Sequence, residues 1–524
     1  MKRGKVYLIG AGPGDIGLLT VKGMRCLQKA EAVVYDFHLN AQILNYINHD
    51  AEFIYAGKRG GHHEMTQDSI NSALIHKAKE GKLVCRLKGG DPFIFGRGGE
   101  EAEALAAEGI EFEVVPGISS SIAAPAYAGI PLTHRKYSSS FSVITGNEDI
   151  TKPESTIEWA KLASGVDTLV FLMGVKNIEN IALKLIGHGK SPDTPAAVVR
   201  WGTRPDQKTV VGTLGNISGQ VKEERIRPPA VMVVGNVVKL RGTLEWYEKK
   251  PLFGQRILIT REYTTDYAML EELGAEIFEF PTIKTVLPES FTSLDAAIDR
   301  ISSYHWLIFT SANGFRFFMQ RFLAKDRDIR DMKGIKLCAI GNKTAGAMGN
   351  YGLKVDLVPE EFNAEGLLNA IVQEHAGKNN AASQLPTATP SLLKGVKILL
   401  PRAEIARELF PKKVREFGGE IDTPVAYRTI KPEKHGKRLK RFLQEGRISV
   451  ATFTSAATFN NFIEMMGDDA MSLLKPAAIA AIGPVTESAI NKAGLTVSIV
   501  PKEATITAMV QAIIAWHQQL PQQE

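Results

Sequence analysis

The stretch RLKGGDPFIFGRGGEE, residues 86–101, combines five glycines with six charged side chains and follows an apolar run that is typical of a buried strand. Adjacent glycines allow main-chain amides and carbonyls to approach a ligand that larger side chains would keep away. Asp91 adds one fixed acceptor, Pro92 fixes the turn, and the apolar side chains of residues 93–95 can wall a slot. An ordinary loop before a helix explains each feature alone, but it explains the combination poorly.

Around this stretch, short apolar strands alternate with helical segments. The runs KVYLIG, AVVYD, KLVCRL and FEVVPG are separated by helical patterns such as those at 18–30 and 100–108. This alternation is typical of an α/β domain. Further strands are expected at TLVFLMG, AAVVRWG and AVMVVGNVV, and the polar, charged segment 241–254 then marks a domain boundary.

The C-terminal half of the chain repeats itself. Residues 395–429 echo residues 254–285, and VATFTSAATFNNFI echoes WLIFTSANGFRFFM at a similar offset. Each unit reads as a strand, a helix and a strand, followed by two more strand–helix pairs. We therefore predict two similar small α/β domains with parallel sheets in this half.

Composition limits the class of protein. The chain has 524 residues, of which 44% are hydrophobic and 23% charged. A chain of this length is expected to form two or three globular domains. No apolar run reaches the roughly 18 residues that a membrane span needs, so we expect no membrane partner. The formal net charge of +6 is modest and no basic run carries interleaved aromatic residues, which disfavours nucleic-acid binding. The three cysteines are far apart and indicate buried thiols in a reducing cytoplasm.

The segment VYLIGAGPGD, residues 6–15, is similar to a dinucleotide-binding turn but lacks its last glycine. Asp15 stands where G-x-G-x-x-G requires glycine, and a carboxylate beside a helix N-terminus would repel a pyrophosphate. A ligand without phosphates is therefore the better interpretation, and a dehydrogenase is disfavoured. A tight turn that merely needs glycine is the alternative.

The motifs GAGPGD, GKRGGHH, RLKGGDPFIFGRGGEE, VPGISS, AYAGIPLTHR and FLMG together resemble the uroporphyrinogen-III C-methyltransferase family, over roughly residues 4–245. This family moves methyl groups from S-adenosylmethionine to a tetrapyrrole. The resemblance implies a two-lobed tetrapyrrole methyltransferase fold instead of a Rossmann fold, with the cofactor between the lobes, and a homodimer formed through this domain. It also implies cofactor contacts at Pro13, Gly89, Gly90, Asp91, Ile94, Ser119, Ser120, Met173 and Gly202.

The implied reaction is displacement at the methyl carbon by an electron-rich pyrrole carbon, followed by loss of a proton from the macrocycle. A positioned base adds roughly 10²- to 10⁴-fold to such a rate. Asp36 and Lys58 match family positions for the proton acceptor and donor. Arg97, Glu100 and Arg135 match positions proposed to hold the substrate or take its proton, so the identity of the base stays open. The alternative for Asp36 is a strand-end cap or a ribose acceptor, and the alternative for Lys58 and Arg135 is a solvated charge.

Basic residues in these motifs suit a substrate with many carboxylates. Arg59, Arg97 and Arg135 have a reason to face a cleft, because guanidinium groups pair well with carboxylates. His62 and His63 have no third ligand at a usable spacing, so no metal is expected.

The duplicated half resembles the uroporphyrinogen-III synthase family over residues 252–517, through GQRILITR, IFTSANG, AIGNKTA, PVAYRT, FTSAAT and AIGPVTESA. The resemblance implies a pair of flavodoxin-like α/β lobes between which the chain crosses. The expected organisation is a methyltransferase domain at 1–245, a linker at 246–253 and a synthase domain at 254–524, with lobes at about 254–286 plus 425–524 and at 287–424.

Hydroxyl side chains in this half follow strands where helices begin, and such helix termini attract carboxylates. These candidate substrate contacts are Thr310, Ser311, Thr344, Thr454, Ser455 and Thr486. Each of them could instead only cap its own helix. The implied reaction closes linear hydroxymethylbilane and inverts its last ring, and Tyr427 matches the family position favoured for the acid that assists departure of hydroxide. Packing is the alternative for this tyrosine.

The sequence thus predicts a cytoplasmic bifunctional enzyme whose C-terminal half makes uroporphyrinogen III and whose N-terminal half methylates it twice, to precorrin-2, with S-adenosylmethionine as methyl donor and no metal. One rival methylates another tetrapyrrole carbon and has an inactive C-terminal half. A second rival makes that half a module that senses a tetrapyrrole without transforming it. No dehydrogenase or chelatase segment precedes Met1, so later steps toward siroheme are expected in other proteins.

Overall fold

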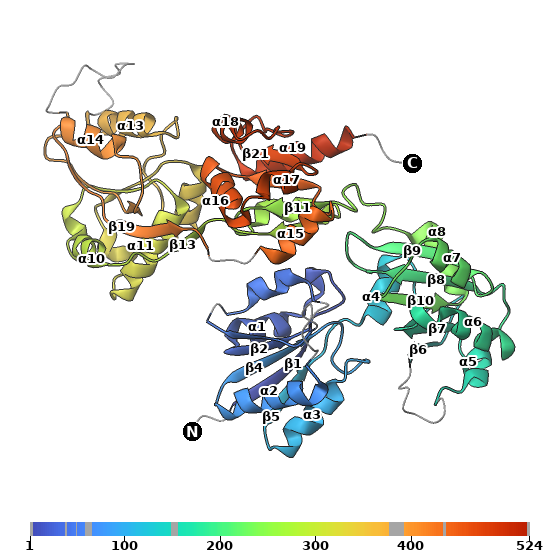
Figure 1. Cartoon of the computed structure of the whole chain (residues 1–524). Coiled ribbons are helices and arrows are strands. Elements are labelled where there is room, and N and C mark those ends of the chain that lie inside the picture. Colours follow the sequence, from blue (N-terminus) through green and yellow to red (C-terminus); the bar gives the residue numbers. More distant parts are fainter. Residues whose placement is uncertain are drawn as a thin grey trace.

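The chain folds into four lobes, two in each half, and each lobe is built on one sheet of four or five strands (Figure 1). A small three-stranded sheet joins the two C-terminal lobes. The computed structural model describes residues 4–36, 39–48, 50–57, 65–147, 156–376, 392–432 and 436–520. No helix in these ranges is long and apolar enough to cross a membrane.

The first lobe is an all-parallel sheet in the order β3-β2-β4-β1-β5. Its strands are β1 (Lys5–Gly10), β2 (Ala32–Tyr35), β3 (Glu52–Tyr55), β4 (Leu83–Lys88) and β5 (Glu111–Val115). Its helices are α1 (Val21–Lys29), α2 (Gln67–Lys79) and α3 (Gly98–Ala107). Val6, Leu8 and Val34 are fully buried, as parallel strands covered on both faces require. The central strand β4 differs because Arg86 and Lys88 are buried in it.

Side chains of the sequence define where the helices of the first lobe begin. Thr20 accepts a hydrogen bond from the Gly23 amide and starts α1, and Thr66 does the same for the Ser69 amide at the start of α2. Both threonines are N-caps, and each hydroxyl accepts a hydrogen bond from one amide of the first helical turn. The helix α3 starts without such a cap, from a left-handed Arg97.

The second lobe is a mixed sheet in the order β6-β7-β10-β8-β9, in which only β6 and β7 are parallel. Its strands are β6 (Phe141–Thr145), β7 (Thr168–Leu172), β8 (Pro195–Arg200), β9 (Lys208–Thr213) and β10 (Ala230–Val234). Its helices are α4 (Ser120–Tyr127), α5 (Trp159–Gly165), α6 (Ile178–Gly187), α7 (Ile217–Glu223) and α8 (Arg241–Leu244). The helix α4 leads from the first sheet to this lobe (Figure 1).

The C-terminal half contains two parallel four-stranded sheets, β12-β11-β20-β21 and β15-β14-β16-β18. The strands of the first are β11 (Arg256–Ile259), β12 (Glu276–Glu279), β20 (Val450–Phe453) and β21 (Ala478–Ala481). The strands of the second are β14 (Trp306–Phe309), β15 (Lys336–Ala339), β16 (Lys397–Leu399) and β18 (Glu420–Asp422).

The two sequence repeats exchange halves. The strands β11 and β12 come from the first repeat but share a sheet with β20 and β21 of the second, through the pairing of β11 with β20. The other sheet combines the remaining strands of the two repeats. The chain crosses between the lobes at β13 (Lys284–Val286) and β19 (Val425–Ile430), which pair antiparallel, and β17 (Arg402–Ala403) pairs with β19. Each lobe core is therefore complete only when both repeats have folded.

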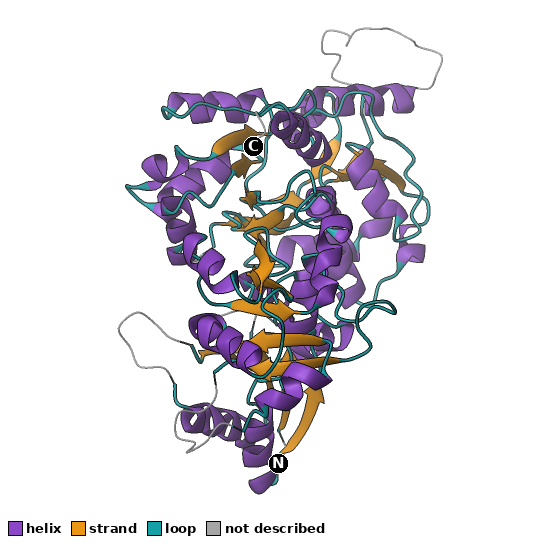
Figure 2. Ribbon diagram, turned by 90° about the vertical axis from the view of Figure 1, so that its right-hand side faces the viewer, coloured by secondary structure: helices purple, strands orange, loops and turns teal. Residues whose placement is uncertain are grey.

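Helices cover the sheets of this half on both sides (Figure 2). Those in its first half are α9 (Ala268–Glu272), α10 (Thr292–Asp299), α11 (Ala312–Ala324), α12 (Asn342–Gly349) and α13 (Ala364–Ala376). Those in its second half are α14 (Leu409–Glu416), α15 (Lys437–Gln444), α16 (Ala456–Met466), α17 (Ala470–Leu474), α18 (Pro484–Lys492) and α19 (Ile506–Gln518).

The predicted fold class is confirmed: two α/β lobes come first, and a pair of parallel-sheet lobes follows. Cys85 and Cys338 are buried free thiols, as expected, and burial raises the pKa of Cys338 to about 12. Cys26 is only partly buried.

Candidate functional site

Bare main chain meets at the carboxyl ends of β1, β4 and β5, where parallel sheets characteristically bind ligands. The Gly90 amide donates to the Gly12 carbonyl at 2.8 Å, and the Gly12 amide donates back at 3.2 Å. A side-chain carbon built on Gly10 would come within 2.5 Å of the Gly117 Cα. The ends of β1 and β5 can therefore approach each other this closely only because both residues are glycine. Gly90 itself is left-handed, with φ 69°.

Gly89 differs from these glycines because packing does not require it. A Cβ built on Gly89 would meet no atom within 4 Å, and its φ is not positive. The residue is exposed at the end of the central strand. The space beside the Gly89 Cα is therefore open.

The Asp91 carboxylate holds the turns around this main chain. One oxygen, Oδ1, accepts hydrogen bonds from the amides of Phe93 at 2.8 Å and Ile94 at 3.1 Å, and Oδ2 accepts from the Gly117 amide at 2.9 Å. Asp91 is 8% exposed. The sequence predicts a ligand contact at Asp91, and this stays a prediction. In the structure both carboxylate oxygens accept hydrogen bonds from main-chain amides, so the side chain joins the two turns.

Large apolar side chains that are between 38% and 55% exposed follow these turns and the end of β7. They are Phe93, Ile94, Phe95, Ile118, Ile122 and Met173. The sequence predicted such an apolar wall from residues 93–95. Ser119 caps α4, is 3% exposed and hydrogen-bonds Ser121, and the Ser120 amide lies beside Gly90.

Left-handed backbone concentrates in the same region. Of the seven described non-glycine residues with positive φ, five flank the predicted cofactor contacts. These are Phe95, Arg97, Met173, Trp201 and Thr203. Such conformations cost energy and typically persist where a site requires them.

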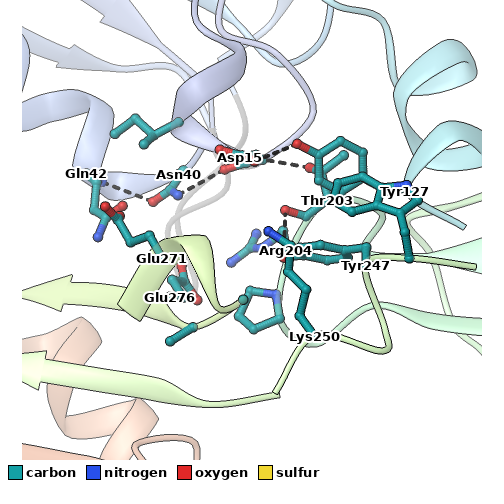
Figure 3. A pocket seen from close by; sticks show the side chains of 16 residues that line it. Asp15, Asn40, Gln42, Tyr127, Thr203, Arg204, Tyr247, Lys250, Glu271 and Glu276 are labelled. Atoms are coloured by element: carbon teal, nitrogen blue, oxygen red, sulfur yellow. Dashed lines mark hydrogen bonds between the residues drawn. The ribbon is translucent and has the colours of Figure 1, made fainter. Parts of the chain in front are cut away.

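The loop after β8 packs against the GPGD turn and the start of the second lobe. A Cβ on Gly202 would clash with the Ala124 side chain of α4, which explains this glycine. Thr203 Oγ1 accepts a hydrogen bond from the Asp15 amide at 3.0 Å, and the Tyr127 hydroxyl donates to Asp15 Oδ2 at 2.7 Å (Figure 3). Burial, and then the bond to Asp15, raise the pKa of Tyr127.

A buried ion network lies under Asp36, the predicted proton acceptor. Arg86 Nη2 contacts Asp36 Oδ1 at 2.6 Å, and Arg86 Nε contacts Glu101 Oε1 at 3.0 Å. Lys88 Nζ reaches the same Glu101 oxygen at 2.7 Å. The side chains of Arg86, Lys88 and Glu101 are at most 5% exposed, whereas Asp36 is 31% exposed. Burial lowers the pKa of Lys88.

Three further predicted charges of this half, Arg97, Glu100 and Arg135, lie on the surface. Arg97 forms a two-point contact with Glu100, from Nε to Oε1 at 2.9 Å and from Nη2 to Oε2 at 2.7 Å. Its guanidinium lowers the pKa of Glu100. Arg135 is exposed in the turn closed by His134 and Ser138.

Some predicted residues lie outside the described ranges: Lys58, Arg59, His62 and His63. Asn147 is exposed, and its amide donates to Thr145 Oγ1 at 3.2 Å. Pro13 lies partly buried in the GPGD turn. Within the described chain, no group of three or more metal-ligating side chains is present.

In the C-terminal half, Tyr427 and Ser311 come together from different repeats. Their hydroxyl oxygens are 3.1 Å apart, and the Tyr427 ring stacks on Phe317 at 5.6 Å between centroids. Ser311 also caps α11, because its Oγ accepts the Gly314 amide at 2.9 Å. A half-buried phenol is thereby oriented by packing and by one hydroxyl.

The remaining hydroxyl candidates follow the carboxyl ends of strands in both lobes. Ser455 caps α16 and exchanges hydrogen bonds with Thr458, so its own helix uses it. Thr344 and Thr486 are buried in the first turns of α12 and α18, which start at glycines without side-chain caps. Thr310 is exposed, and Thr454 is half-buried.

In the N-terminal half, the sequence analysis missed the buried ion network of Arg86, Lys88 and Glu101. Two charges within the apolar strand β4 are a signal that could have indicated it.

Two family models match the chain. The model described as tetrapyrrole (corrin/porphyrin) methylases matches residues 5–218, and the model described as uroporphyrinogen-III synthase HemD matches residues 266–511. A porphyrin biosynthesis protein HemD from Ruminiclostridium josui is 37% identical over 517 residues, which are 98% of this chain and 98% of the relative. An S-adenosyl-L-methionine-dependent uroporphyrinogen III methyltransferase from Methanosarcina barkeri is 56% identical over 46% of this chain and 94% of its own. A uroporphyrinogen-III C-methyltransferase from Priestia megaterium is 54% identical over 45% of this chain and 98% of its own.

We predict that Glu101→Gln destabilises the protein by about 3–5 kcal/mol, because it leaves the Arg86 and Lys88 cations buried with less compensation. The matched control is Glu103→Gln, an exposed position on the same helix. The measurement is urea unfolding followed by circular dichroism. Equal unfolding midpoints for the two variants would contradict a stabilising network.

Proposed function

Because the chain belongs to the HemD family of porphyrin biosynthesis proteins, with a tetrapyrrole methylase ahead of a uroporphyrinogen-III synthase, we propose that one polypeptide makes uroporphyrinogen III and methylates it. In this proposal the C-terminal half closes hydroxymethylbilane and inverts its last ring. The N-terminal half then adds two methyl groups and yields precorrin-2. S-adenosylmethionine is the methyl donor.

The main chain at Gly89 carries the assignment of the methyl-donor site. The residue is glycine although no neighbouring protein atom requires it, and it lies in a turn that Asp91 fixes through three amides. Bare main chain beside exposed apolar side chains fits a donor that has no phosphates. When bound, this donor supplies an electrophilic methyl group. The protein fixes the direction from which the pyrrole carbon approaches it, which can contribute much of the rate.

Two carboxylates compete for the role of base. Asp36 is held by the buried Arg86, so its position is fixed. Glu100 is held by the exposed Arg97, whose contact also keeps its pKa low. In the proposed complex a substrate carboxylate takes over Arg97, which leaves Glu100 free to accept a proton. Asp36 is the better-positioned base, and Arg97 is the better substrate contact.

In the C-terminal half, Tyr427 assists departure of hydroxide from the linear substrate by donating its phenolic proton. Support comes from its contact with Ser311 and its stacking on Phe317, which fix the phenol at the crossing between the lobes. The substrate supplies the reactive carbon after water has left, so the lobes mainly hold the chain in a curl. Helix termini in both lobes offer amides to its carboxylates.

The direct test of the proposed function is mass spectrometry of the products from hydroxymethylbilane, with and without S-adenosylmethionine. We predict a dimethylated type III macrocycle with the donor and unmethylated uroporphyrinogen III without it. Tyr427→Phe should lower ring closure about 10²- to 10⁴-fold. Tyr351→Phe, at a tyrosine whose ring meets Phe315 edge-on, should not lower it. Binding without ring closure would instead make this half a sensing module.

We also predict that Gly89→Ala weakens S-adenosylhomocysteine binding at least about tenfold, or 1.4 kcal/mol, because the added methyl group would occupy the space left for the ligand. The thermal unfolding midpoint should stay that of the parent, since the Cβ meets no protein atom. Titration calorimetry measures the affinity. Gly99→Ala, where a Cβ also meets nothing, is the control. Parental affinity of Gly89→Ala would refute this location for the ligand.

A further inference from the structure

Asp206 links the two halves of the chain. It lies in the loop 201–207, between β8 and β9 of the second methyltransferase lobe. Its Oδ2 pairs with Arg447 Nη2, and its Oδ1 lies 3.8 Å from Arg256 Nη2. Both arginines belong to the lobe of β11 and β20. A side chain of the N-terminal half is therefore held by the C-terminal half.

The C-terminal partners of Asp206 belong to a group of buried and half-buried arginines. Arg256 is 4% exposed, donates to Glu276 at 2.6 Å and also bonds the Arg447 carbonyl at 3.2 Å. Arg438 is buried nearby, and this burial, together with the neighbouring Arg204, lowers its pKa to about 10. Asp206 brings a negative charge to this group of guanidinium side chains, where an anion is favoured.

The loop that carries Asp206 also carries a predicted cofactor contact. Gly202 to Pro205 are buried, and Trp201 and Thr203 have left-handed backbone. Such a conformation has to be held by its surroundings. From the N-terminal half, Thr203 is tied to the Asp15 amide. From the C-terminal half, Arg447 holds the same loop through its ion pair with Asp206.

A cavity lies where these parts meet (Figure 3). Asp15, Thr203 and Arg204 line it from the N-terminal half, and Glu271 and Glu276 line it from the C-terminal half. In the close-up, Thr203 lies beside Asp15, and Arg204 lies across the cavity from Glu271 and Glu276. The loop 201–207 is thus in contact with both halves.

We propose that the C-terminal half is a positioning partner of the methyltransferase, holding the loop of Gly202 through the contact of Asp206 with Arg447. This inference rests on the proposed function, because it assigns the loop to the methyl-donor site. Asp206 and Arg447 are positioning residues and touch neither substrate. The contact lies at the amino ends of β11 and β20, whereas the hydroxyl candidates of the C-terminal half follow the carboxyl ends of strands. Loss of the contact should therefore affect methyl-donor binding and spare ring closure.

The test uses the full chain as parent, Asp206→Asn, Arg447→Gln and the double variant. We expect each single variant to bind S-adenosylhomocysteine about 3- to 10-fold more weakly. The double variant should bind no more weakly than Asp206→Asn alone, because that variant already removes the contact with Arg447. Ring closure of hydroxymethylbilane and the thermal unfolding midpoint should stay parental. Arg441→Gln, in the same lobe and paired with Glu445, is the control and should bind like the parent.

Each other outcome overturns the inference in a recognisable way. Parental affinity in the single variants, or additive losses in the double variant, would show that the contact does not hold the loop. A parallel loss of ring closure would show general damage instead of positioning. A parent that fails to bind S-adenosylhomocysteine would refute the proposed methyl-donor site, and this inference would fall with it.

Discussion

Three backbone amides converge on the Asp91 carboxylate, and the candidate methyl-donor site depends on this convergence. The carboxylate joins the turn after β4 to the turn after β5, and the glycines at 10, 90 and 117 allow the two turns to meet. Without it, three partly buried amide donors would lose their acceptor, at a cost of about 1–3 kcal/mol for each donor that no water reaches. Gly89 then presents bare main chain at a fixed position.

The same arrangement recurs in the C-terminal half with different chemistry. There too, polar groups gather at the carboxyl ends of parallel strands, where helix amides are free. The exchange of halves between the repeats places Tyr427 beside Ser311, although they are far apart in the sequence. The crossing strands β13 and β19 thus bring the candidate acid of one repeat to the helix start of the other.

Sequence reasoning found elements whose signal is local. It found β1, β2, β4 and β5, and the apolar runs of β1 and β2 arise because both faces of the sheet are covered there. In the N-terminal half it missed β3, β6 and β9, which are short or partly exposed. The helix cap at Ser311 follows from a hydroxyl after a strand, and this was expected.

Features that depend on distant neighbours could not be predicted. The pairing of Arg86 with Glu101 requires knowing which helix covers β4. Left-handed backbone at Met173 and Trp201 has no sequence signal, because neither residue is glycine or asparagine. The contact of Asp206 with Arg447 depends on how the two halves meet.

The most direct measurement is titration calorimetry of S-adenosylhomocysteine with the full chain and with Asp91→Asn. The amide cannot replace both carboxylate oxygens as acceptors, so the turns should separate and the main chain at Gly89 should lose its position. The account predicts binding by the parent and a loss of at least about tenfold in the variant, or 1.4 kcal/mol. Equal affinity of the two proteins would contradict it.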